Sequence, residues 1–169
     1  MLSFFKKNAN GKVNKTGKDS TISSKDLLNE QEQGDSSTET EVETVLSFHP
    51  NWTIPAEQQY VYRYLNNELD PLHPNQISLA GVEINQDNDN LVVTAFFRNS
   101  LPKAIRIQDT VLLLIGPNGE KLARQTFDLS VLGEIPAKSS RPWHFIFTKD
   151  SILSSTIPSE GWKLAFELT

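Results

Sequence analysis

The side chains that most often carry chemistry are scarce in this chain, and their spacing does not bring them together. There are three histidines, His49, His73 and His144, and there is no cysteine. Two of the histidines precede prolines in expected loops, and the third lies between aromatic residues of an expected strand. A histidine zinc site needs its ligands to converge on one point, with further hydrogen bonds that orient the rings. We therefore expect structural or exposed roles for all three and no bound metal.

The most oxygen-rich run is Asp87-Asn88-Asp89-Asn90. It lacks the glycine and the distal glutamate of a calcium-binding EF-hand loop, so we expect a β-turn there. The sequence contains neither a Gly-x-Ser-x-Gly nucleophile elbow nor a Gly-x-x-x-x-Gly-Lys phosphate loop. Paired carboxylates for glycoside chemistry stay open, because spacing cannot exclude them. The inventory predicts no catalytic residue, no cofactor and a protein that binds or organises instead of catalysing.

The charge balance and the apolar runs limit the partners. The formal net charge is −5, and from Leu46 onward 10 Lys and Arg residues stand against 13 Asp and Glu residues. A nucleic-acid groove needs clustered cations, so we expect no nucleic acid. The apolar start of the chain ends at Lys6, short of a secretion signal, and no stretch approaches the roughly 20 apolar residues of a spanning helix. We expect a cytoplasmic protein whose membrane contact, through Leu2, Phe4 and Phe5, is at most transient.

Two regions are predicted along the chain. Residues 1–45 are expected to form a disordered tail, because they are rich in Lys, Asn, Ser, Thr, Glu and Gln, with scattered apolar residues. The charges of this tail are segregated, with a basic front and an acidic back, and a short helix near Ser24–Gln31 is a further expectation. Residues 46–169 are expected to form one folded domain, which opens with a short extended piece at residues 45–48.

An amphipathic helix is predicted from Ala56 to Leu69. Pro55 suits its start, because the missing N–H of proline would be unpaired there anyway, and Asp70-Pro71 suits its end. The residues of the expected buried stripe recur at helical spacing. They are Tyr60, Val61, Tyr64, Leu65 and Glu68.

The aromatic residues on and beside this helix have two possible roles. Tyr60, Tyr62, Tyr64 and Trp52 can pack in a core, or they can form a face that binds a partner, since Tyr and Trp are favoured at the centres of protein interfaces. Trp52, Tyr60 and Tyr64 are the candidate partner-binding residues.

Short strands separated by turns dominate the rest of the chain. They are expected near residues 77–84, 91–98, 105–107, 111–115, 122–128, 143–147 and 162–168. The apolar phase shifts at Ala80-Gly81, which predicts a bulge or kink, and Leu91–Arg98 is apolar on both faces, which predicts a central strand. Trp143 and Trp162 are expected in the core. The fold class is mainly β, an antiparallel Ig-like β-sandwich with one N-terminal helix.

Five phrases of the sequence carry a resemblance to a known family. They are residues 55–62 (PAEQQYVY), 72–81 (LHPNQISLAG), 93–103 (VTAFFRNSLPK), 129–143 (LSVLGEIPAKSSRPW) and 161–168 (GWKLAFEL). With them, the chain resembles the accessory Sec system S-layer assembly protein family, whose domain is the SLAP domain. The likeness covers about residues 48–168, and no catalytic residue is assigned in the family.

The resemblance implies a non-enzymatic cytoplasmic factor that assists accessory Sec-dependent export and assembly of S-layer proteins at the translocase. The implied partners are an accessory SecA-type motor ATPase and S-layer protein precursors. Family members carry this domain in two copies, whereas this chain holds one, which leaves open a short paralogue or a truncated member. The alternative is an extracytoplasmic or cell-wall-associated ligand-binding β-sandwich, and it needs a route out of the cell.

Overall fold

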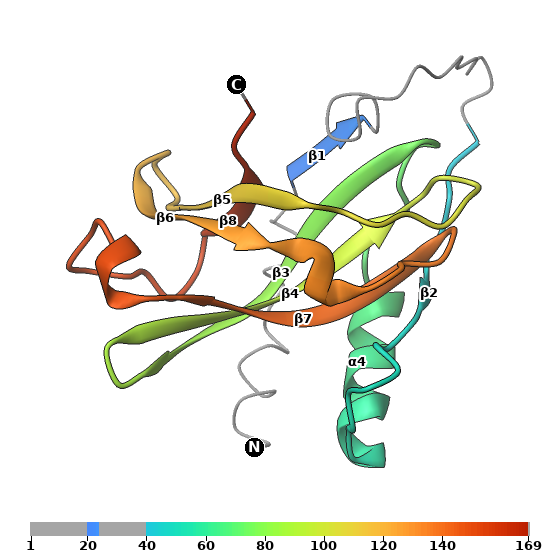
Figure 1. Cartoon of the computed structure of the whole chain (residues 1–169), viewed down its shortest axis with the longest axis horizontal. Helices are drawn as coiled ribbons and strands as arrows, with labels where there is room; N and C mark the ends of the chain where they lie inside the picture. Colours follow the sequence, from blue (N-terminus) through green and yellow to red (C-terminus); the bar gives the residue numbers. More distant parts are fainter. Residues whose placement is uncertain (1–19, 24–39, 169) are drawn as a thin grey trace.

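The structure is a computed structural model that describes residues 20–23 and 40–168, and these residues form two β-sheets and one α-helix (Figure 1). The larger sheet has the strand order β1-β3-β4-β7-β2, and the smaller sheet has the order β6-β5-β8. The strands are β1 (Ser20–Ser23), β2 (Val45–Leu46), β3 (Gln76–Asp87), β4 (Asn90–Asn99), β5 (Asp109–Ile115), β6 (Lys121–Asp128), β7 (Ser139–Phe147) and β8 (Lys163–Phe166). Every pairing is antiparallel except that of β2 with β7. The predicted mainly β, two-sheet fold is confirmed.

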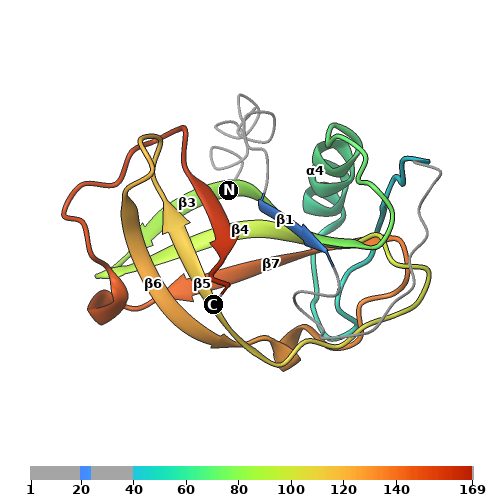
Figure 2. The ribbon, with the colours of Figure 1, turned by 90° about the horizontal axis from the view of Figure 1, so that it is seen from above.

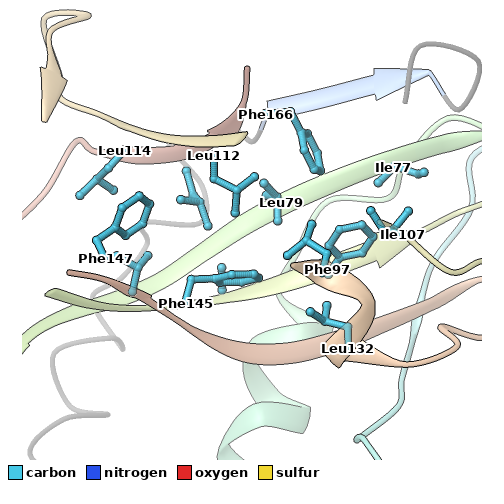
Figure 3. Close-up of a cluster of buried hydrophobic side chains, with 14 of the residues drawn as sticks. Ile77, Leu79, Phe97, Ile107, Leu112, Leu114, Leu132, Phe145, Phe147 and Phe166 are labelled. Carbon is cyan, nitrogen blue, oxygen red and sulfur yellow. The ribbon is translucent and has the colours of Figure 1, made fainter. Parts of the chain in front are cut away.

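The two sheets enclose the main apolar core, which Figure 3 shows in close-up. Residues of β4 alternate, so that Leu91, Val93, Ala95 and Phe97 all lie on the core side of the sheet. Fully buried side chains of the other strands meet them there. They include Ile77, Leu79, Leu112, Leu114, Phe145 and Phe147. Burial of this much apolar surface is the main stabilising contribution to the fold, and β4 lies at the centre of its sheet as predicted.

The bulge in β3 is present and has a packing reason. The register between β3 and β4 shifts between Gly81 and Glu83, close to the predicted position. The Trp162 ring packs directly on Gly81, where an added Cβ would lie 2.5 Å from the Trp162 Cζ3 atom. Only glycine allows this approach, and Trp162 itself is 3% exposed, as expected of a core residue.

The helix α4 (Ala56–Asn67) covers the other face of the five-stranded sheet, away from β5, β6 and β8 (Figures 1 and 2). Its buried residues are Tyr62, Leu65 and Asn66, so the predicted stripe is right for Leu65 and for the partly buried Val61 and wrong for its other members. Tyr60 and Tyr64 were expected inside and are 70% and 53% exposed. Tyrosines at every second position of this helix point to both of its faces, so composition could not choose the phase. The sheet takes the face that places Tyr62 and Leu65 inward together.

Three other expectations differ from the structure. Ile105–Ile107 forms no strand but a single bridge from Ile105 to Ile135. Trp143 is only partly buried. The short strand β2 pairs only with Ser139 and Ser140, so β7 forms the edge of the sheet where Trp143 lies. The last predicted strand is shorter, and the side chain of Ala165 in it is buried as well, so the strand is not half-exposed.

The predicted disordered tail differs from the structure in two places, since Ser20–Ser23 pairs with β3 and the residues from Thr40 onward contact the folded domain. In both places the backbone of the tail makes hydrogen bonds to the domain, which composition does not predict. The expected helix near Ser24–Gln31 and the residues Leu2, Phe4 and Phe5 lie outside the described residues. Among the described helices, none is long and apolar enough to span a bilayer.

Candidate interaction surfaces

The three histidines do not form a site together, although two of them enter one aromatic cluster. His144 forms a 2.8 Å hydrogen bond between its Nδ1 and Thr94 Oγ1, and its ring centre lies 5.2 Å from that of Trp52. His49 Nδ1 accepts a hydrogen bond from the Asn51 backbone N–H, and its ring lies 5.6 Å from Trp143. Burial lowers the pKa of His144 and so favours the neutral ring. Over the described part of the chain, no three His, Asp or Glu side chains gather closely enough to hold a metal ion.

The run Asp87–Asn90 forms the turn between β3 and β4, so the predicted β-turn is confirmed. Asn88 has a positive φ of 63°, the left-handed backbone conformation that this tight reversal needs and that asparagine adopts more readily than most residues. The side chain of Asn90 accepts a hydrogen bond from the Lys149 backbone N–H. The Asn90 side chain therefore links this turn to the segment that follows β7.

The three candidate partner-binding residues lie in two different environments. Trp52 is partly buried and packs against Trp143 and Tyr62, with ring centres 5.5 and 6.3 Å apart. Tyr60 and Tyr64 lie one turn apart on the outer face of α4. The structure thus separates a packing residue, Trp52, from an exposed tyrosine pair.

Beneath the helix, Tyr62 joins α4 to the sheet. Its ring meets those of Phe96 and Phe48 edge to face, each at 6.0 Å between centres. Burial raises the pKa of the Tyr62 hydroxyl, and the nearby carboxylate of Glu83 raises it further, so the hydroxyl stays protonated. The ring of Tyr62 thereby anchors the helix to the sheet.

Residues 40–48 cross the end of the five-stranded sheet as an extended segment, which we call the strap. Two buried arginines hold it, and the sequence analysis missed both. Arg141 donates to the carbonyls of Ser47, Leu132 and Glu134, at 3.1, 2.7 and 3.0 Å. Arg98 donates to the Asp70 carbonyl at 2.9 Å and to Thr44 Oγ1 at 3.3 Å. The signal was a single arginine within each of two largely buried strands, since such a charge is buried only where it is paired.

Two hollows flank the strap. A groove of about 420 Å³ is lined by Thr40, Glu41, Val42, Glu43, Pro74, Asn75, Ser100, Pro102 and Lys138. A polar cavity of about 170 Å³ lies on the other side, against Arg98 and Asn66. The Asn66 side chain donates to the Thr44 carbonyl, and its Oδ1 atom accepts no hydrogen bond within the described structure. Ordered water is the usual partner of such a buried oxygen, so this cavity has a structural explanation.

The family of this chain follows from a comparison with models of known protein families. The model of the SLAP domain matches residues 46–168. The chain belongs to the SLAP domain family. The match includes α4, both apolar clusters and the strands from β3 to β8, and it confirms the resemblance found in the sequence. The strand β1 and the first part of the strap lie outside the matched residues.

No curated protein and no solved structure is significantly similar to the chain. The name of the SLAP family connects the domain with accessory Sec systems and S-layer proteins, and that association is the functional information the match supplies.

Proposed function

We propose that this chain is a non-enzymatic cytoplasmic accessory factor in the accessory Sec-dependent export and assembly of S-layer proteins. The observation that carries the proposal is the SLAP family match over residues 46–168. The side chains of Arg98 and Arg141 hold backbone segments in place, which supports a binding role for the domain. The partners that we propose are an accessory SecA-type motor ATPase and S-layer protein precursors.

The exposed tyrosine pair of α4 is the first contact surface that we propose. Tyr60 and Tyr64 offer two large amphipathic rings on one helix face, and neither supports the fold from inside. Tyrosine loses little conformational entropy on binding and is frequent among the residues that dominate interface energies. Trp52 contributes indirectly, by packing on Tyr62 beneath the helix.

The test is co-purification of the tagged full chain from the native host, with the motor and the S-layer precursor quantified by mass spectrometry. We expect enrichment of at least one of them over an untagged control, and a strain without the motor identifies which contact is direct. Failure to enrich either protein contradicts the proposal.

The contact surface is tested with the double variant Tyr60→Ala/Tyr64→Ala. Leu153→Ala is the matched control, since Leu153 is also an exposed apolar residue, 60% exposed, but lies after β7 and bonds to β6. We expect the double variant to lose most of the partner signal and the control to retain it. Equal loss or equal retention in the two variants contradicts a role for the tyrosine pair.

Cell fractionation tests the proposed compartment. We expect the protein with cytosolic markers, including the fraction that sediments with the translocase. Recovery from the cell wall or the medium, with cytosolic markers retained, would instead support the extracytoplasmic ligand-binding module. A tightly bound nucleotide or metal in the purified protein would contradict the non-enzymatic assignment.

A further inference from the structure

The outer edge of β3 is covered by a strand that does not belong to the SLAP domain. Within the matched residues 46–168, β3 is the last strand on its side of the five-stranded sheet. The strand β1, which lies along it, comes from residues 20–23 (Figures 1 and 2). A bare strand edge offers unpaired N–H and C=O groups to any extended chain, and proteins usually cover such edges.

The register identifies the backbone groups that face β1. The pairing is antiparallel, with Ser20 opposite Leu79 and Ile22 opposite Ile77. On the inner side, the Gln76 backbone N–H donates to Ser100 Oγ and its carbonyl accepts from the Ser100 N–H. Because successive residues of a strand turn their backbone groups to opposite sides, Ser78 also bonds inward, to β4, while Ile77 and Leu79 face outward. The edge therefore presents two N–H and two C=O groups, which Ile22 and Ser20 pair.

We propose that the Ile77–Leu79 edge of β3 is a strand-acceptor site, which the chain's own Ser20–Ser23 occupies and which an extended segment of an exported precursor takes by displacing it. Naming the precursor rests on the proposed function; the acceptor edge itself does not. Strand addition of this kind obtains its affinity from main-chain hydrogen bonds.

The chemistry of the occupant follows from β1 and from the shape of β3. The sequence Ser-Thr-Ile-Ser shows that small hydroxyl and β-branched residues suit the site. The shift in register between Gly81 and Glu83 interrupts the regular edge, so the site accommodates a short segment of about four residues. At the other end, Ser23 lies opposite Gln76, next to Asn75 and Ser100 in the wall of the 420 Å³ groove. A longer segment can continue into that groove.

The covalent connection makes β1 a competitor of the partner. Residues 24–39 join β1 to the strap covalently, so β1 competes for the edge as an intramolecular ligand. Four paired residues form few hydrogen bonds, and each contributes only modestly in water, so β1 can be displaced. The native β1 thus protects the edge from unwanted pairing and yields it to a longer partner.

Two proline variants of the full chain test the acceptor edge. Ile22→Pro removes an N–H that points to β3, whereas the N–H of Thr21 points away from β3, so Thr21→Pro is the matched control. We expect Ile22→Pro to speed hydrogen exchange at the Ile77 and Leu79 amides by at least about 10-fold, since each loses its partner. The Ser78 amide, which bonds to β4, should stay protected in all three proteins. Unchanged exchange at Ile77 and Leu79 in Ile22→Pro would overturn the proposal.

A labelled synthetic peptide with the sequence of residues 17–26 tests the exchange of occupants. We expect it to bind Ile22→Pro at least about 10-fold more tightly than the native chain or Thr21→Pro, because the tethered competitor is gone. Binding should restore protection of the Ile77 and Leu79 amides. Equal binding to all three proteins, or binding without that protection, would overturn the proposal. A concentration-dependent dimer of the native chain that Ile22→Pro abolishes would show that β1 fills a second copy, which would also overturn it.

The source of the occupant is tested with the purified S-layer precursor held unfolded. We expect it to bind Ile22→Pro more tightly than Thr21→Pro and to be displaced by the peptide. If the peptide binds and protects the edge but the precursor does not, the acceptor edge stands and its assignment to a precursor is wrong. Co-purification of the motor then still tests the proposed function separately.

Discussion

The two faces of the five-stranded sheet differ in how they are covered, and adjacent residues of β4 show the difference. Phe97 points into the core between the sheets, among aliphatic and aromatic side chains. Phe96 points to the opposite face, where α4 and the strap cover a smaller cluster with Tyr62. The buried polar residues Glu83, Thr94 and Arg98 lie on that second face or at its margin. Both phenylalanines are almost fully buried, so burial alone does not distinguish the faces.

The comparison shows that apolar packing between the sheets stabilises the fold, whereas the face under the helix combines apolar packing with hydrogen bonds of polar side chains. A sheet packed on a sheet excludes water over a wide area, and only apolar residues satisfy it. One helix of 12 residues covers less, so Arg98 and His144 complete the second face through hydrogen bonds, and the ring of Tyr62 packs against that of Phe96. The outer side of that helix remains available to a partner.

The largest expected effect is on the free energy of unfolding, and it differs between the two faces of the sheet. Phe97→Ala should lower the free energy of unfolding by about 4–5 kcal/mol, because it leaves a cavity that the two sheets cannot close. Phe96→Ala should cost about 3 kcal/mol, since α4 can shift to fill part of the space. Urea titration of both variants measures the difference. Equal losses would show that the helix face is as rigid as the core.

Adding a methyl group to the core face should lower the free energy of unfolding less than removing a phenylalanine ring from it. Gly81→Ala places a methyl group 2.5 Å from the Trp162 ring and should cost about 1–3 kcal/mol. It should also change the tryptophan signal in near-ultraviolet circular dichroism. Gly119→Ala is the control, since Gly119 has φ 84° but no neighbouring atom within 4 Å, and it should cost about 1 kcal/mol with the spectrum unchanged. A native spectrum in Gly81→Ala would contradict the close packing of Trp162.

A partly buried histidine, His144, should make the helix face sensitive to pH. Burial lowers the pKa of His144, so the unfolded chain binds a proton more readily than the folded chain. Stability should therefore be complete above pH 6.5, the ordinary value, and decrease as pH falls from there towards the folded pKa. Urea midpoints measured between pH 8 and 5 test this.

The His144→Gln variant should remove part of that slope, because it removes the imidazole whose pKa burial lowers. An unchanged slope in His144→Gln would assign the pH dependence to other groups.

The smallest expected effect on stability belongs to the outer side of α4. Tyr64→Ala and Tyr60→Ala should each change the free energy of unfolding by no more than about 0.5 kcal/mol, because both side chains are exposed. Tyr62→Ala, two residues away, should cost about 3 kcal/mol or more, since it removes the anchor of the helix. A large loss in Tyr64→Ala would favour core packing, the other of the two roles that the sequence left open.

Sequence reasoning found the strands more reliably than it found the faces. The bulge near Gly81, the central place of Leu91–Arg98 and the turn at Asn88 followed from apolar phase and from turn residues, which act locally. The phase of α4 did not follow, because Tyr60, Tyr62 and Tyr64 offer aromatic rings to every side of the helix. The roles of Arg98 and Arg141 were also missed, since their acceptors are backbone carbonyls far away in the sequence.

The candidate site was predicted in its residue types but not in its arrangement. The sequence identified Trp52, Tyr60 and Tyr64 together, and the structure divides them between the inside and the outside of the helix. The covered edge of β3 was not predicted, because Ser-Thr-Ile-Ser within a polar tail gives too short a strand signal to stand out.

The sequence by itself determined the mainly β fold, the family and the scarcity of residues that could do chemistry, because each of these depends on local pattern and composition. Only the tertiary structure decided which tyrosines the sheet buries, which carbonyls the arginines hold and which strand covers the edge of β3. Those choices depend on contacts between segments that are distant along the chain, and the free energies that decide them arise only when the segments meet.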